Sequence, residues 1–458
     1  GIASRANAGD GDAGKVTVKA DDLVIDGGGR VDGALISGAT LADGDAGSVD
    51  VTATTLTIRG GGGIGSSTFG NGDGGEVKVE ADELTIDGDG VSGFTGISGN
   101  INGGLAGDAG EITVVADRLT IRNDGEIISN AFFGSGDAGT IVVRAGQLVI
   151  DGANAPGFTG ISTGTQTTGD AGTVTVEADR LVIDGANAAI DSDTEAGSTG
   201  NAGAISVSAD TVEIAGGSQV ASSANGRGTA GDVVVGAADR LSVDRGSITT
   251  ESAFGGGGEI RLLVGDVIDL RDSAVTTSVA GGADPTAGNI TIDPTILIID
   301  GSRIQANAPA GSGGTVTIVA DNILVPGGDF QALLDRKDIS ATGGDPTRAG
   351  TIAVSAPEVD LSGGLVVVEG AFIDTAPLRE RCGSRRDIGV SSFTGVGRGG
   401  LPPSPDGPLA GAYASGLGEP GVALLLEERD EELFAEEHSV ERAIGPVLAG
   451  LVPCHGAL

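Results

Sequence analysis

A short segment returns almost unchanged along most of this chain. The sequence GDAGKVTVKADDLVIDGG, which begins at Gly11, recurs as GDAGSVDVTATTLTIRGG from Gly44 and as GDAGTVTVEADRLVIDG from Gly169. The last glycine of each such start marks one repeat, and successive marks are on average about 30 residues apart, a period typical of solenoids and arrays. A chain with this period is expected to fold as a stack of similar units. The marks are Gly14, Gly47, Gly75, Gly110, Gly139, Gly172, Gly203, Gly231, Gly258, Gly288, Gly314 and Gly350.

Each unit carries two aliphatic pairs with strand spacing. The second and fourth residues after the mark are aliphatic, as in Val16 and Val18, and the residue between them is usually polar. A second pair, such as Leu23 and Ile25, follows at the ninth and eleventh positions, after a short link such as KADD. Alternation of this kind indicates strands with one buried face. In two units the second pair slips by one residue (Leu241 with Val243, and Ile268 with Leu270), which predicts an inserted residue or a bulge.

A third, shorter strand is predicted in each unit by an isoleucine followed by a small or polar residue. Because all the links are too short for helices, each strand can stack on its copy one unit later. The sequence therefore predicts an all-β fold, a right-handed parallel β-helix (a solenoid) of about twelve three-strand coils over residues 1–370. The third-strand segments are Ile36-Ser37, Ile97-Ser98, Ile128-Ser129, Ile161-Ser162, Ile190-Asp191, Ile248-Thr249, Ile304-Gln305 and Ile339-Ser340.

The composition suits a narrow aliphatic interior. The chain has 85 glycines, 10 phenylalanines, one tyrosine and no tryptophan or methionine, so Val, Ile, Leu and Ala must fill the core. We expect the glycines to provide positive-φ corners, and the aspartates of the GDAG-like starts to bond the backbone of their own turns. The aspartates are Asp12, Asp45, Asp108, Asp137 and Asp170. The formal net charge of −38 opposes binding to nucleic acid or anionic lipid, and no transmembrane segment is predicted.

The tail, residues 371–458, differs from the coils. Its proline-rich part GRGGLPPSPDGPL favours an extended segment, and ALLLEERDEELFAEEHSVERAIGPVLAGLV has the spacing of an amphipathic acidic helix. This segment could cover the last coil, or it could anchor the protein or engage a pore. The only cysteines, Cys382 and Cys454, form a possible disulfide in an oxidising compartment.

The coils, written GDAG-x-[VI]-x-V-x-AD-x-L-x-ID-GG … I-S, resemble the repeats of filamentous haemagglutinin-like exoproteins of Gram-negative and cyanobacterial surfaces. The tail segment RCGSRRDIGVSSFTGVGRGGLPPSPDGPL, Arg381 to Leu409, is similar to the terminal signature of that group. The resemblance implies two-partner secretion through an outer-membrane pore, followed by secretion or cell-surface display as an adhesin. We expect a C-terminal fragment of such a protein, because there is no initiator methionine and Ile2-Ala3-Ser4 fits the third strand of a preceding coil. The expected partners are that pore and glycans or surface proteins of a host or neighbouring cell.

Other functions remain open at this point. An enzyme should interrupt the repeat with a cluster of ionisable groups. No such cluster is apparent, and both histidines, His438 and His455, lie in the tail. We therefore expect no catalytic residue, cofactor or metal ligand, and we interpret Arg180, Arg240 and Arg261 as solvated charges. The alternatives are a carbohydrate-active β-helix enzyme (a polysaccharide lyase or hydrolase), a structural sheath protein, and calcium binding along the column of corner aspartates. Ice binding is disfavoured because the outward threonine row is interrupted.

Overall fold

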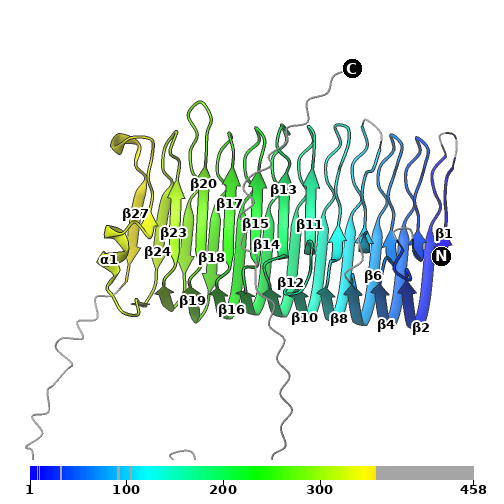
Figure 1. The fold of residues 1–458 in the computed structure, drawn as a ribbon, viewed down its shortest axis with the longest axis horizontal. Helices are drawn as coiled ribbons and strands as arrows, with labels where there is room; N and C mark the ends of the chain where they lie inside the picture. Colours follow the sequence, from blue (N-terminus) through cyan, green and yellow to red (C-terminus); the bar gives the residue numbers. More distant parts are fainter. Residues whose placement is uncertain (8, 10, 31–32, 90–92, 104–105, 357–458) are drawn as a thin grey trace, which may run out of the picture. The chain divides into compact units, whose positions relative to one another are not determined.

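The structure, a computed structural model, describes residues 1–7, 9, 11–30, 33–89, 93–103 and 106–356, and these form a parallel β-helix (Figure 1). All strand pairs among the described residues are parallel, and each strand pairs with its counterparts one coil before and one coil after. The predicted stack of parallel coils is confirmed. The tail from residue 357 on, with Cys382 and Cys454, lies outside the described residues.

The described coils are built from two sheets. The short-strand sheet consists of β1 (Ile2–Ala3), β3 (Leu35–Ser37), β5 (Gly63–Gly65), β7 (Thr95–Ser98), β9 (Gly125–Ile128), β11 (Thr159–Thr165), β13 (Ala188–Thr194), β15 (Gln219–Ala224), β17 (Ser247–Ser252), β20 (Ala274–Val279), β23 (Arg303–Asn307) and β26 (Ile339–Ser340). The long-strand sheet begins with β2 (Val16–Asp26), β4 (Val49–Arg59), β6 (Val77–Asp87), β8 (Ile112–Arg122), β10 (Ile141–Asp151), β12 (Val174–Asp184), β14 (Ile205–Ala215) and β16 (Val233–Asp244).

In the later coils the long strand is divided. The sheet continues as β18 (Ile260–Val264) with β19 (Val267–Arg271), β21 (Ile290–Asp293) with β22 (Ile296–Asp300), β24 (Thr315–Val319) with β25 (Asn322–Leu324), and β27 (Thr351–Ser355). A helix α1 (Phe330–Asp335) and a 3₁₀ turn η1 (Pro346–Arg348) lie in the last described coils. Asp329 caps α1, and its side chain accepts a hydrogen bond from the Ala332 N–H at 2.7 Å.

The expectation of three separate strands per coil is wrong for the first eight long strands. The two predicted strands and the link between them form one continuous strand of eleven residues, or of twelve in β16. The reason is that the bend at the link leaves only one position unpaired: in β4 and β6, Ala53 pairs with Ala81 and Thr55 pairs with Glu83. A small residue at the bend therefore lets the ladder of hydrogen bonds continue without a loop.

The predicted slip in register is confirmed. Between β14 and β16 the pairing runs from Ala209 with Ala237 to Thr211 with Arg240, so β16 contains one extra residue. The next coil keeps the new register, because Leu241 pairs with Ile268.

The core is a set of aliphatic columns, as the alternation predicted. Val49, Leu56 and Ile58 are fully buried, and each lies directly beneath the same kind of residue in the next coil. The third-strand prediction is confirmed for Ile36, Ile97 and most of its other members, but Ile128-Ser129 is wrong by one residue. Ile127 occupies the inward column there, and Ile128 pairs with the outward Ser162.

The GDAG turns are held by bonds between coils. The Asp45 carboxylate accepts the N–H of Asp73 at 2.9 Å, and the Asp73 carboxylate accepts the N–H of Asp108 at 2.9 Å. The same contact joins Asp108 to Asp137 and Asp137 to Asp170. The expectation that each aspartate bonds its own turn is therefore wrong, because the stacked N–H of the following coil lies within reach and the carboxylate accepts from it.

The glycines have two different roles. Some lie at positive φ, as Gly60 does at 54° and Gly185 at 102°, which agrees with the expected corners. The mark glycines do not lie at positive φ. At Gly172 an added Cβ would lie only 1.9 Å from the carbonyl oxygen of Gly139 in the preceding coil. The mark glycines thus allow close stacking of consecutive turns. This second role was not predicted from the sequence.

Candidate functional site

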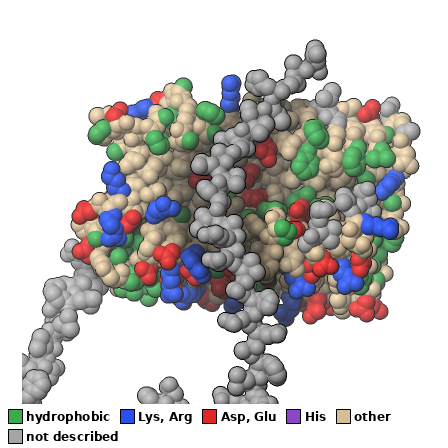
Figure 2. Space-filling view, in the orientation of Figure 1, with side chains coloured by type: hydrophobic (Ala, Val, Ile, Leu, Met, Phe, Trp, Pro, Cys, Tyr) green, Lys and Arg blue, Asp and Glu red, His purple; other side chains and the backbone are tan. Residues whose placement is uncertain are grey.

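A hollow opens on the outer face of the short-strand sheet, over the coils of β3, β5, β7 and β9. Its volume is about 520 Å³, within the roughly 300 to 1,000 Å³ typical of ligand sites. Apolar side chains gather over these N-terminal coils, at the right of Figure 2. The lining residues include Arg5, Ser37, Leu41, Ser67, Phe69, Phe94, Ser98, Asn100, Asn102, Glu126 and Phe132.

Missing side chains create the hollow. Gly63 and Gly65 of β5 occupy positions whose counterparts in the neighbouring coils are Leu35 and Ser98. A Cβ on Gly65 would lie 2.6 Å from the Ser98 Oγ, and a Cβ on Gly63 would lie 3.4 Å from the Phe94 ring. Any side chain at these two positions would therefore meet the groups that surround the hollow.

One wall of the hollow is a column of four side chains, three of them large and apolar. Bridges join Thr40, Thr68, Ile101 and Ala131 in successive coils, so the residues that follow them are also stacked. These following residues are Leu41, Phe69, Asn102 and Phe132. Leu41 is 51% exposed and Phe69 is 48% exposed, so two neighbouring coils present apolar surface to solvent side by side.

The floor of the hollow is polar and only partly satisfied. The Ser37 hydroxyl accepts the N–H of Ala39 at 3.2 Å, and the Asn100 side-chain oxygen accepts the N–H of Asn130 at 2.9 Å. In contrast, no hydrogen bond within the described residues uses the side chains of Ser67, Ser98 or Asn102. The hollow therefore offers free hydroxyl and amide groups beneath an apolar wall.

Further along the same face, three carboxylates lie near the glycines of β11. In the register of β9, β11 and β13, Glu126 is opposite Gly160, and Asp193 is opposite Gly164. Burial and the nearby Asp124 carboxylate raise the pKa of Glu126 to about 7. Burial raises the pKa of Asp193 to about 6, although hydrogen bonds from Ser223 oppose the shift. Burial and the neighbouring Asp193 raise the pKa of Asp191 as well.

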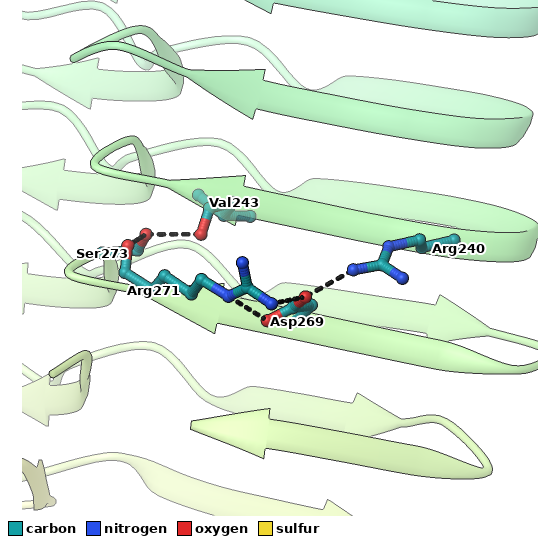
Figure 3. Close-up of polar contacts among 5 residues, drawn as sticks. All are labelled: Arg240, Val243, Asp269, Arg271 and Ser273. Atoms are coloured by element: carbon teal, nitrogen blue, oxygen red, sulfur yellow. Dashed lines mark hydrogen bonds and ion pairs between the residues drawn. The ribbon is translucent and has the colours of Figure 1, made fainter. Parts of the chain in front are cut away.

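A different carboxylate on the long-strand sheet is fully paired (Figure 3). Asp269 of β19 is 1% exposed and accepts hydrogen bonds from Arg271, at 3.1 Å from Nε and 2.9 Å from Nη2. Arg240 of the preceding coil also pairs with it. Next to this group, the Ser273 hydroxyl donates to the Val243 carbonyl at 2.7 Å, which ties the same two coils together. This cluster joins two coils, and both oxygens of the buried carboxylate already accept hydrogen bonds from arginines.

The predicted residues have different outcomes. The interpretation of Arg180 and Arg240 as solvated charges is incomplete, because Arg180 pairs with Glu213 of the next coil at 3.1 Å and Arg240 pairs with Asp269. The possible Cys382–Cys454 disulfide lies outside the described residues. No group of three or more His, Cys, Asp or Glu side chains within the described ranges has the arrangement of a metal site.

The sequence interpretation missed the hollow and the carboxylates near β11. A signal for the hollow was present, since Leu41, Phe69 and Phe132 each come five residues after the inward isoleucine of their coil. Alignment of the repeats on that isoleucine would have placed these side chains in one column.

Comparisons with known proteins provide no relative: no family model, no curated protein and no solved structure matches the chain.

Proposed function

We propose that this chain is the shaft of a secreted or surface-displayed adhesin, which presents a long repetitive face and performs no catalysis. The observation that carries the proposal is the uniformity of the stack. From β2 to β16 the inward columns continue through every coil, and consecutive turns are linked by the same side-chain contact, in which the acceptor is an aspartate as far as Asp170 and then Asn201. A rod of this kind extends a binding surface without the single interruption that an active site requires.

The proposed route and location follow from the resemblance of the coils and of the Arg381 to Leu409 segment to filamentous haemagglutinin-like exoproteins. We propose export by two-partner secretion through an outer-membrane pore, and attachment to the outer surface of a Gram-negative or cyanobacterial cell or release from it. No helix within the described ranges is both long enough and apolar enough to cross a lipid bilayer. The proposed partners are the pore and surface glycans or proteins of a host or neighbouring cell.

The adhesin proposal is tested by retention on cells. The fluorescently labelled chain is incubated with Gram-negative and eukaryotic cells, and bound fluorescence is measured by flow cytometry against an acidic globular protein of similar charge. Saturable retention that excess unlabelled chain displaces supports the proposal. Retention no greater than that of the acidic control on every cell type contradicts it and favours a structural sheath protein.

One observation favours a carbohydrate-active enzyme as the second candidate. Glu126, Asp191 and Asp193 lie on one outer face, and their raised pKa values suit a general acid near neutral pH. The test is release of reducing ends from polygalacturonate, alginate and neutral glycans, with the double variant Glu126→Gln/Asp193→Asn as the control. Release that the double variant abolishes would replace the adhesin proposal with this one.

A further inference from the structure

We propose that the hollow over β3, β5, β7 and β9 binds an uncharged oligosaccharide, with the apolar column Leu41, Phe69 and Phe132 as its stacking wall. The inference rests on the proposed adhesin function, because it gives that function a site and a ligand class.

The chemistry of the hollow matches the two kinds of surface on a sugar. A pyranose ring has C–H faces that pack on aromatic rings and a rim of hydroxyl groups that both donate and accept hydrogen bonds. Phe69 supplies exposed aromatic surface, and the half-buried Phe132 supplies a second ring in the lining. Ser67, Ser98 and Asn102 supply hydroxyl and amide groups that no other described residue engages. An apolar wall with a few unsatisfied polar groups is the usual composition of a ligand site.

The charge of the hollow selects for a neutral ligand. The chain carries a formal charge of −38, which repels anionic polysaccharides at long range. Among the described lining residues, Arg5 is the only cation and Glu126, whose pKa is raised to about 7, is the only acid, so the lining carries at most one net positive charge near neutral pH. An uncharged glycan therefore meets no long-range electrostatic repulsion when it enters the hollow.

The backbone beneath the hollow is not available to a peptide. Peptides that extend a sheet bind to an unpaired edge, but β5 is paired with β3 on one side and with β7 on the other. Recognition must therefore come from side chains. In this wall Leu41 and Phe69 come from adjacent coils, about 4.8 Å apart, whereas the coil of Asn102 separates Phe69 from Phe132.

Saturation-transfer NMR provides the test. The whole chain is mixed separately with neutral hexasaccharides of glucose, xylose, mannose and N-acetylglucosamine, with hexagalacturonate, and with the peptide LPPSPDGPL, which tests a proline-rich ligand. We expect saturation of ring C–H protons in at least one neutral hexasaccharide. We expect the affinity to fall at least about tenfold in Phe69→Ala and in Phe132→Ala, because truncated aromatic anchors usually account for losses of this size.

Matched controls are available in the same chain. Phe133 is 56% exposed and Phe254 is 58% exposed, and neither lines the hollow. Phe133→Ala and Phe254→Ala should therefore bind within about twofold of the unmodified chain. Because Phe69 is already half exposed, its truncation should leave the circular dichroism spectrum and the unfolding temperature unchanged.

Three results would overturn the inference: no binding of any neutral hexasaccharide, binding of hexagalacturonate or the peptide alone, or equal binding by Phe69→Ala and Phe133→Ala. The cell-retention assay separates this failure from failure of the proposed function. Retention on cells without glycan binding would refute the proposed glycan site and support the adhesin function. Glycan binding without retention would support the site and refute the adhesin function.

Discussion

The mark glycines should tolerate no side chain, and Gly172→Ala tests this. Gly172 has no positive φ, so alanine would be acceptable there on backbone conformation alone. Its Cβ would nevertheless lie 1.9 Å from the Gly139 carbonyl oxygen, and real Cβ contacts are not closer than 3.0 Å. The two turns must therefore separate by about 1 Å. Two bonds between these coils flank the contact, from Ala138 N–H to Asp170 and from Ile141 N–H to Thr173, both 2.9 Å long.

Lengthening both bonds by this amount breaks them, and each costs about 1 to 3 kcal/mol when one partner stays buried and unsatisfied. We therefore expect Gly172→Ala to lower the free energy of unfolding by about 2 to 6 kcal/mol. The measurement is urea unfolding followed by circular dichroism, with the linear slope checked to confirm that the same structure unfolds.

Gly236→Ala is the matched control for this experiment. Gly236 lies within β16, also without positive φ, and an added Cβ would make only an ordinary contact of 3.7 Å with the Val207 carbonyl oxygen. Replacement of a glycine by alanine at a compatible position stabilises by about 0.4 to 1 kcal/mol, because it restricts the unfolded chain. Equal stability of Gly172→Ala and the unmodified chain, or equal loss in the two variants, would refute the stacking argument.

Three further predictions follow from the core and the charged groups. Leu119→Ala, which truncates a fully buried side chain, should destabilise by about 2 to 5 kcal/mol in urea unfolding, and a loss below about 0.5 kcal/mol would contradict the packed column. Arg271→Ala leaves the buried Asp269 with Arg240 as its remaining ion-pair partner, so the unfolding temperature should fall in low salt and recover if Asp269→Asn is added. The raised pKa of Glu126 means that the folded chain keeps a proton which the unfolded chain loses, so stability falls as the pH rises from 4.5 to about 7. Glu126→Gln should thus raise the unfolding temperature at pH 8 but not at pH 4, and an equal effect at both would contradict the shift.

The inward columns could be predicted because a period of two leaves no choice of face. Val49 and Val51 alternate with a polar residue, so only one arrangement buries both, and the structure has it. The same argument placed Ile2 opposite Ile36 in the stack. The period of two did not identify the inward residue at Ile127 and Ile128, because two adjacent isoleucines fit the alternation in either register. The register there depends on the lengths of the flanking turns, which the alternation does not describe.

The candidate site was harder to predict, because it depends on side chains that are absent as much as on those present. Gly63 and Gly65 look like ordinary glycines of a glycine-rich repeat until the register places Gly63 beside Leu35 and Gly65 beside Ser98. The carboxylates of Glu126 and Asp193 are also hard to single out in a chain with 64 acidic residues. Only the register shows that each lies next to a glycine of β11, Glu126 opposite Gly160 and Asp193 opposite Gly164.

The GDAG turn varies less along the chain than the outward residues of the strands do. The reason is that each turn makes hydrogen bonds to more than one coil. The Gly172 carbonyl accepts hydrogen bonds from the buried hydroxyls of Thr163 at 2.8 Å and Ser192 at 2.7 Å, which belong to two different coils. The adjacent Asp170 accepts the N–H of Asn201 in the next coil and donates its own N–H to Asp137 in the previous one. A change at one turn therefore leaves polar groups of its neighbours unsatisfied inside the stack, where each costs about 1 to 3 kcal/mol. An outward strand residue meets only solvent and its lateral neighbours. Surface features such as the apolar hollow can consequently vary from coil to coil while the turns beneath them stay the same.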